Sequence, residues 1–147
     1  DTADLVLSSE VIEHAPDPIG FLAALGRLAR PGGLVLVTGL FGSGFDIATL
    51  REKSNAVAPP HHLNFPSRRG VRSMIARAGL EELEFLTPGK LDVDIVVNAL
   101  ASDPRATADS FARNLAIHAD EKTRAAFQEF LSAQCMSSHM WIVARRS

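Results

Sequence analysis

Short apolar runs alternate with amphipathic segments through the first half of the chain. Residues 5–7 (Leu-Val-Leu) and 34–37 (Leu-Val-Leu-Val) are apolar without alternation, which is typical of strands buried on both faces of a parallel sheet. Between them, apolar side chains recur at helical spacing from Ile19 to Ala29, and Asp17-Pro18 supplies a capping carboxylate and a first-turn proline. The pattern therefore predicts a strand, a helix and a second strand joined as a right-handed βαβ unit.

Farther along the chain, the pattern predicts more helices and two more strands. They are a short helix within residues 45–57, a helix that Ser67 caps and Gly79 ends, a strand across residues 80–85 and a last strand at residues 140–144. Between the last two strands, residues 91–137 are expected to form a helical insertion, with ambiguous periodicity at first and Asp120 as the cap of its final helix. An α/β domain with a helical insertion follows from this order of elements.

The composition is that of a globular protein with one core. Hydrophobic residues make up 46% and charged residues 22% of the 147 residues, a length that fits one domain. The net charge of -2 comes without a block of basic residues, so nucleic acid is not an expected partner. No apolar run reaches the roughly 20 residues needed to span a bilayer, and the single cysteine, Cys135, has no partner for a disulfide. We therefore expect a cytoplasmic protein without a membrane partner.

Four segments carry a family resemblance. Residues 4–18 (DLVLSSEVIEHAPDP) resemble the fourth strand and following turn of class I S-adenosylmethionine-dependent methyltransferases. Residues 25–37 (LGRLARPGGLVLV), 62–67 (HLNFPS) and 74–80, which end in Ala-Gly-Leu, resemble the segments that follow in that family. The resemblance implies a three-layer, Rossmann-like sheet, mostly parallel, with an antiparallel last strand. It also implies methyl transfer from S-adenosylmethionine to a small-molecule acceptor.

The resemblance begins partway through the family's domain. The glycine-rich turn that holds the cofactor in that family, and the acid that holds its ribose, have no counterpart in this sequence. The chain also lacks an initiator methionine and begins directly before a predicted strand. We therefore expect residues 1–147 to be one partial, truncated domain that is inactive in isolation. Residues 5–7 would then form an exposed apolar sheet edge, which favours a homodimer.

The end of the first strand is the expected cofactor site. In an open α/β sheet, ligands bind beyond the carboxyl ends of the strands, near the point where the strand order reverses. In the resembled fold that point lies beside this strand, so Ser8, Ser9, Glu10 and Val11 are expected to border the methionine part of the cofactor. The alternative is that these residues simply end a strand and cap a turn.

Glu13 and His14 are the candidate acid-base pair. A histidine titrates near neutral pH, and an adjacent carboxylate can hold or tune it. Glu10, Glu13 and His14 resemble the acid-acid-histidine cluster with which related quinone O-methyltransferases hold a divalent cation. The match covers only part of that cluster, so no metal ligands are assigned, and a structural role for His14 at the turn is the alternative. His118, His139 and Cys135 lack the spacing of a zinc site.

Phe41, His61 and His62 are the candidate acceptor-binding residues. The two histidines follow Pro59-Pro60, in a segment that faces the acceptor pocket in the resembled fold. Adjacent side chains point apart on an extended chain, so at most one histidine is expected to face the site.

Two other functions stay open on the residues alone. One is a non-catalytic α/β binding module. The other is a nucleotide-binding oxidoreductase fragment that uses the glycine-rich loop at residues 39–44. Gly42 and Gly44 fit the pattern Gly-x-Gly-x-x-Gly, but Ile47 occupies its third position and the partner acid is missing.

Overall fold

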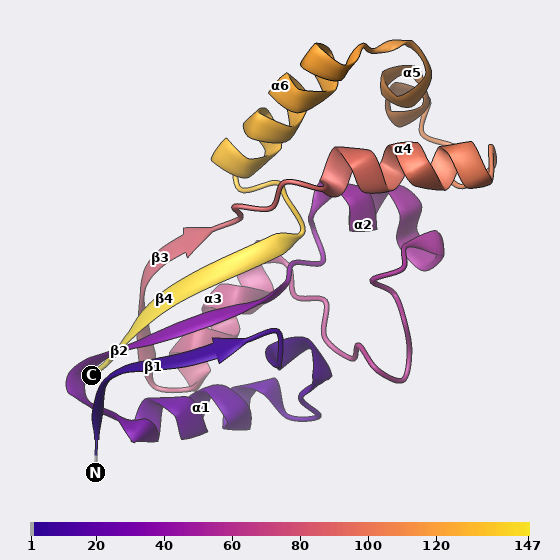
Figure 1. The fold of residues 1–147 in the computed structure, drawn as a ribbon. Helices are drawn as coiled ribbons and strands as arrows, with labels where there is room; N and C mark the ends of the chain where they lie inside the picture. Colours follow the sequence, from indigo (N-terminus) through magenta and orange to yellow (C-terminus); the bar gives the residue numbers. More distant parts are fainter. Residues whose placement is uncertain (1) are drawn as a thin grey trace.

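A four-stranded sheet in the order β1-β2-β4-β3 organises the computed structural model, which describes residues 2–147 (Figure 1). The strands are β1 (Ala3–Ser9), β2 (Ala29–Leu40), β3 (Leu80–Leu86) and β4 (His139–Arg146). β1 pairs with β2 in parallel, and β4 pairs with both β2 and β3 in antiparallel fashion. Three strands thus run in one direction and the last in the other, which confirms the predicted mixed sheet.

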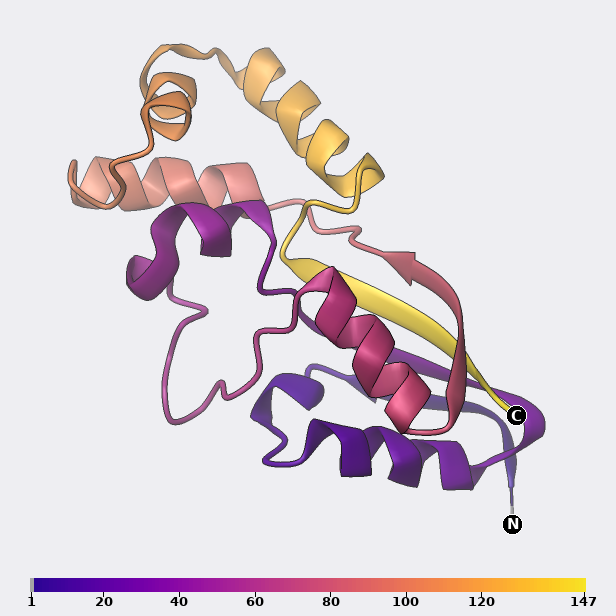
Figure 2. The same ribbon diagram turned by 180° about the vertical axis from the view of Figure 1, so that it is seen from behind.

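Two amphipathic helices, α1 (Pro18–Leu28) and α3 (Arg68–Arg77), pack on one face of the sheet (Figure 2). Each begins where the sequence predicts, because Asp17 and Ser67 accept a hydrogen bond from the backbone N–H three positions on. The core between helices and sheet includes Ile12, Leu22, Val35, Val37, Val71, Ile75, Met140 and Ile142.

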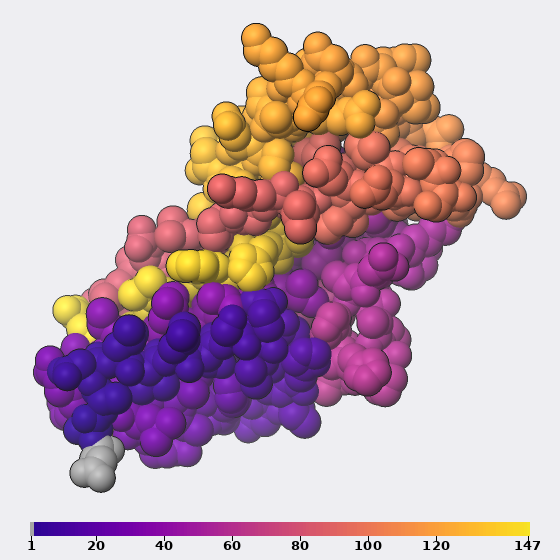
Figure 3. Space-filling view, viewed as in Figure 1, coloured from indigo at the N-terminus to yellow at the C-terminus, as the bar shows by residue number. Residues whose placement is uncertain are grey.

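The opposite face of the sheet is open. Leu5 and Leu7 are 56% and 62% exposed, and Leu34 and Trp141 are also exposed. Because side chains alternate along a strand, these residues point away from α1 and α3. Figure 3 shows atoms of β4 in yellow at the surface. The prediction that residues 5–7 are buried on both faces is therefore wrong for Leu5 and Leu7, and within residues 2–147 no third layer covers them.

A group of helices, which we call the helical cap, lies beyond one end of the sheet (Figure 1). It consists of α2 (Phe45–Leu50), α4 (Asp92–Ser102), α5 (Ser110–His118) and α6 (Glu121–Ala133), and a 3-10 turn, η2 (Arg51–Lys53), follows α2. The segment whose periodicity was ambiguous forms α4, whose buried side chains include Val93 and Val96. Among residues 2–147, none of the helices has the length and apolar character needed to traverse a bilayer.

Two buried carboxylates join the cap to the sheet. One oxygen of Asp92 accepts hydrogen bonds from Ser137 Oγ (2.6 Å) and Gln128 Nε2 (2.9 Å), and the other accepts one from the backbone N–H of Ser138 (2.7 Å). Asp46 is 2% exposed, and its Oδ1 has no hydrogen-bond partner. Burial, with the negative charge of Asp92, raises the pKa of Asp46 to about 6.

The Asp46→Asn substitution tests this junction. The ordinary pKa of Asp46 is 3.8, so as the pH rises from about 4 to about 6 the unfolded chain loses this proton before the folded one. The free energy of unfolding of the wild type should therefore fall by about 2–3 kcal/mol across that window and stay reduced above it. Denaturant titrations at pH 4–7 should show no such decrease in the free energy of unfolding of D46N. E52Q, which changes an exposed carboxylate, should still show the decrease. An unchanged pH dependence in D46N would contradict the assignment.

Candidate active site at the carboxyl edge of the sheet

Polar side chains from three strands meet at the edge of the sheet nearest the cap. Ser9 of β1 pairs with Thr38 of β2, and Thr38 pairs in turn with Trp141 of β4. His139 lies two positions before Trp141 and pairs with Leu40, so its side chain lies on the same open face. The carboxyl ends of β1 and β2 and the start of β4 therefore form one polar edge, the location at which α/β sheets bind ligands.

The predicted cofactor-binding residues lie on both faces of this edge. Ser8 is 7% exposed on the helix-covered face, and its hydroxyl has no hydrogen-bond partner. Ser9 lies on the open face, with its Oγ 3.0 Å from Thr38 Oγ1. Glu10 and Val11 are exposed in the turn that follows β1. Only Ser9, Glu10 and Val11 therefore present surface to a ligand at this edge.

Glu10 has a strained backbone and a fixed side chain. Its φ of 53° lies in the left-handed region, which costs a residue other than glycine roughly 1–3 kcal/mol. Its Oε1 accepts a hydrogen bond from Thr38 Oγ1 (2.7 Å) and lies 3.5 Å from His139 Nδ1. Because Thr38 uses its hydroxyl proton on Glu10, Ser9 must donate to Thr38. The result is a chain of polar groups from Ser9 through Thr38 to Glu10.

Glu13 and His14 lie on η1 (Ile12–His14), the 3-10 turn after β1. Glu13 is 3% exposed, and its Oε2 has no hydrogen-bond partner. Burial raises the pKa of Glu13 above its ordinary value, and the charge of Glu10 adds to the rise. His14, in contrast, is exposed.

His62 joins this pair from the loop before α3. His14 Nδ1 lies 2.8 Å from the carbonyl oxygen of His61, and His62 Nδ1 lies 2.6 Å from that of Ala56. A carbonyl only accepts, so each Nδ1 donates, and in the neutral rings each Nε2 keeps its lone pair. The two rings are 4.8 Å apart.

Glu13, His14 and His62 could hold a divalent cation, because ligand atoms from the three lie within 4.8 Å of one another. The cluster differs from the one suggested by the resemblance. Glu10 turns toward Thr38 instead of joining Glu13 and His14, and His62 completes the set. The sequence could not indicate this, since 48 positions separate His14 from His62.

The other predicted acceptor residues contribute differently. His61 and His62 are not extended, because both donate their backbone N–H to the carbonyl of Ala58. His62 faces the pair, and His61 is exposed and contributes only its carbonyl oxygen. Phe41 is 3% exposed and packs edge-to-face on Phe85, with the ring centroids 5.2 Å apart. Its ring belongs to the core and has no surface to offer an acceptor in this arrangement.

The glycine-rich loop at residues 39–44 is fastened to the rest of the protein. The backbone N–H groups of Phe41, Gly42 and Phe45 donate to carbonyls of residues 138, 66 and 136. A Cβ on Gly44 would lie 2.2 Å from the Cα of Ser138, so glycine is required there for close packing. A phosphate cradle needs free N–H groups, so this arrangement argues against the nucleotide-binding alternative.

Nothing in the sequence indicated Thr38, His139 or Trp141 as residues of this edge. A polar residue at the end of an apolar strand was the only available signal, and it does not reveal which strands are neighbours. A cavity of about 730 Å³ between the start of α4 and α6 is lined by other residues, including Lys90, Arg124 and Gln128.

Comparisons with known proteins agree with this architecture. A family model described as a methyltransferase domain matches residues 1–84. A ubiquinone biosynthesis O-methyltransferase of Parvibaculum lavamentivorans is 45% identical over 40 residues, which are 27% of this chain and 16% of that protein. An S-adenosylmethionine-dependent methyltransferase of Thermotoga maritima superposes with a TM-score of 0.59 at 14% identity, over 100% of this chain and 57% of that chain.

A phosphoethanolamine N-methyltransferase of Haemonchus contortus, solved with S-adenosylhomocysteine, superposes with a TM-score of 0.54 at 17% identity. The match covers 97% of this chain and 33% of the Haemonchus chain. The chain thus spans about half of the Thermotoga protein and one third of the Haemonchus protein. At these identities the structural likeness concerns the fold alone.

The Asn64 side chain helps to hold the His62 loop against η1, beside backbone hydrogen bonds from Leu63 and Asn64 to the carbonyl of Glu13, and its substitution tests that arrangement. Its Nδ2 donates to the carbonyls of Ile12 (3.0 Å) and Ala15 (2.7 Å). Asn64→Ala leaves both carbonyls without this partner, so the free energy of unfolding should fall by about 1–3 kcal/mol. Chemical denaturation would measure the loss, with Asn55→Ala, at an exposed position of the same loop, as the control. Equal stability of the two variants would show that the loop is held by other contacts.

Proposed function

The chain belongs to the methyltransferase domain family, and from this we propose that it forms part of a site for methyl transfer from S-adenosylmethionine to a hydroxyl oxygen of a small molecule. The family match over residues 1–84 carries the proposal. The choice of oxygen rests on the O-methyltransferase relatives, which are 45–46% identical over short segments. That the acceptor is a small molecule is the hypothesis drawn from the sequence.

The residues at the end of β1 would contact one side of the cofactor. Ser9 and Glu10 offer a hydroxyl and a carboxylate to the charged groups of its methionine part, and Val11 offers an exposed apolar surface. Ser8, whose side chain lies on the helix-covered face, would support this end of the strand from the opposite side. When bound, the cofactor supplies an electrophilic methyl group on a sulfonium. The protein then has to align the acceptor and remove its proton.

Glu13, His14 and His62 would position the acceptor. A carboxylate and two imidazoles can bind a polar group of the acceptor directly or through a divalent cation. The cluster adjoins the cofactor side of the site, because η1, which carries Glu13 and His14, follows the end of β1 directly. We propose the cluster as the acceptor side of the site, with Glu13 as its buried anchor.

Calorimetric titration of the full natural polypeptide tests the function. S-adenosylmethionine should bind and NADH should not, and a radiolabelled methyl group should pass to a hydroxyl probe such as catechol. Binding of NADH alone would favour the oxidoreductase alternative. Binding of S-adenosylmethionine without transfer to any hydroxyl or amine probe would favour the non-catalytic module.

We also propose that a second copy of the chain pairs along the free edge of β1. β1 is an end strand of the sheet, and Leu7 is 62% exposed beside that edge. Sedimentation velocity should detect a dimer of the 147-residue chain at micromolar concentration. Leu7→Lys should shift it to monomer, whereas Leu83→Lys, on the other end strand, should not. A wild-type chain that stays monomeric at high concentration would contradict the proposal.

A further inference from the structure

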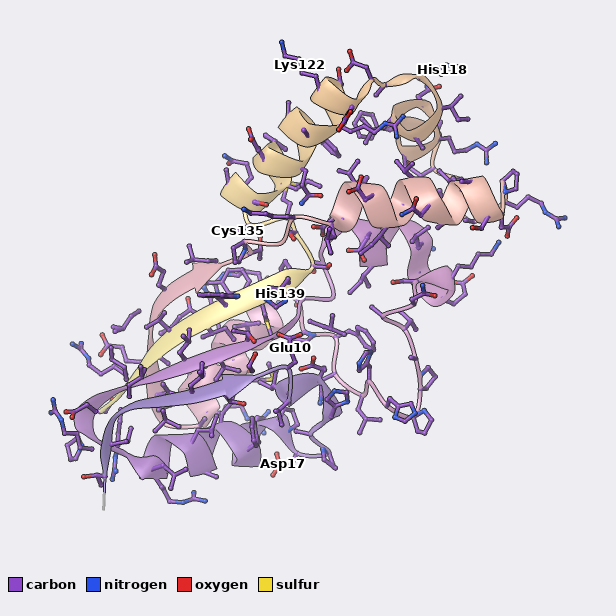
Figure 4. All side chains as sticks on the ribbon, in the orientation of Figure 1. Glu10, Asp17, His118, Lys122, Cys135 and His139 are labelled. Atoms are coloured by element: carbon purple, nitrogen blue, oxygen red, sulfur yellow. The ribbon has the colours of Figure 1, made fainter. Side chains whose placement is uncertain are left out.

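His139 is held in one orientation by neighbours from two elements. Its Nε2 lies 3.0 Å from Trp141 Nε1, and its Nδ1 lies 3.5 Å from Glu10 Oε1. The imidazole and the carboxylate are both partly exposed, at 39% and 46% of their side-chain surface. Figure 4 shows Glu10 and His139 at the same end of the sheet, far from His118 on the cap.

The Trp141 contact fixes the tautomer of His139. An indole N–H can donate a hydrogen bond but cannot accept one, so Nε2 of His139 must carry its lone pair. The proton of the neutral ring is then on Nδ1, which faces the Glu10 carboxylate. This is the form of histidine that can accept a proton at Nε2 while a carboxylate stabilises the resulting positive charge at Nδ1.

Resting on the function proposed above, we propose that His139 is the proton acceptor for methyl transfer, with Glu10 and Trp141 as its positioning residues. Nε2 has a single lone pair, so the acceptor's hydroxyl would take the place of the Trp141 indole N–H there. As the acceptor oxygen bonds to the methyl carbon, the carbon–sulfur bond breaks and its electron pair stays on sulfur. The hydroxyl proton passes to His139 Nε2, which leaves a methyl ether, a neutral thioether and an imidazolium beside Glu10.

Two further observations favour His139. The strained φ of 53° at Glu10 directs that carboxylate across the edge of the sheet, where Thr38 holds it. Strain of this kind persists where the surrounding structure requires it, and such places are often functional sites. His139 also begins β4 at the carboxyl edge, level with the end of β2, on the open face of the sheet. Its Nε2 is therefore on the same side as the exposed end of β1.

Nuclear magnetic resonance of histidine ring nitrogens tests the geometry without any assay of activity. In the wild-type chain, long-range proton–nitrogen spectra should show His139 protonated at Nδ1. Trp141→Phe keeps an aromatic ring and removes the donor, so a population protonated at Nε2 should appear. A wild-type His139 protonated mainly at Nε2 would overturn the proposal, because its lone pair would then point at Glu10.

Kinetics of the full natural polypeptide, with S-adenosylmethionine and catechol, test the role. His139→Ala should lower kcat about 10²–10⁴-fold without changing cofactor affinity, and added imidazole should restore part of the rate. Glu10→Gln should lower kcat with little change in the KM for catechol. His118→Ala, at an exposed position on α5, should match the wild type.

The outcomes separate this proposal from the function on which it rests. If the wild type transfers methyl groups and H139A is equally fast, the role of His139 is wrong and the methyltransferase function stands. If the wild type transfers none to any probe, the proposed function fails, whatever tautomer the spectra show.

Discussion

β4 lies between β2 and β3 and pairs with both in antiparallel fashion, and most other parts of the structure take their positions from these two ladders. The pairing brings the last residues of the chain into the centre of the sheet, where Met140 and Ile142 fill the core against α1 and α3. It also fixes the cap, because residues 136–138 lead from α6 into β4. Carbonyls of this segment accept hydrogen bonds from the backbone N–H groups of Phe41 and Phe45, and its residue 138 donates its N–H to Asp92. This short segment therefore helps to couple the cap to the sheet.

The same pairing divides the titratable groups of the site between the two faces of the sheet. Glu13 lies on the helix-covered side, where a Cβ on Gly39 would come within 2.8 Å of its Oε2. Glu10 lies on the open side with Thr38 and His139. Two carboxylates three residues apart thus have different surroundings. Burial disfavours the charge on Glu13, whereas Glu10 accepts a hydrogen bond and faces an imidazole.

The cap is attached by polar contacts in a place where apolar packing would be expected. Asp92 accepts three hydrogen bonds at the start of α4, and Asp46 lies beside it with one oxygen unpaired. Buried polar groups of this kind specify one arrangement more strictly than apolar contacts do, because every alternative leaves them without partners. The sequence offered no sign of the pair, since the two aspartates are 46 positions apart.

The sequence by itself determined the elements and the family. Helix starts at Asp17, Ser67 and Asp120 and the stop at Gly79 depend on contacts within a few residues, so local chemistry was sufficient to predict them. Ser9, Glu10, Glu13 and His14 became candidates because they lie at or just after the end of a strand within one motif. Only the tertiary structure decided which groups meet. Glu10 and His139 are 129 positions apart, and they become neighbours because β4 enters the sheet beside β2, a pairing that depends on the whole core and leaves no local mark in the chain.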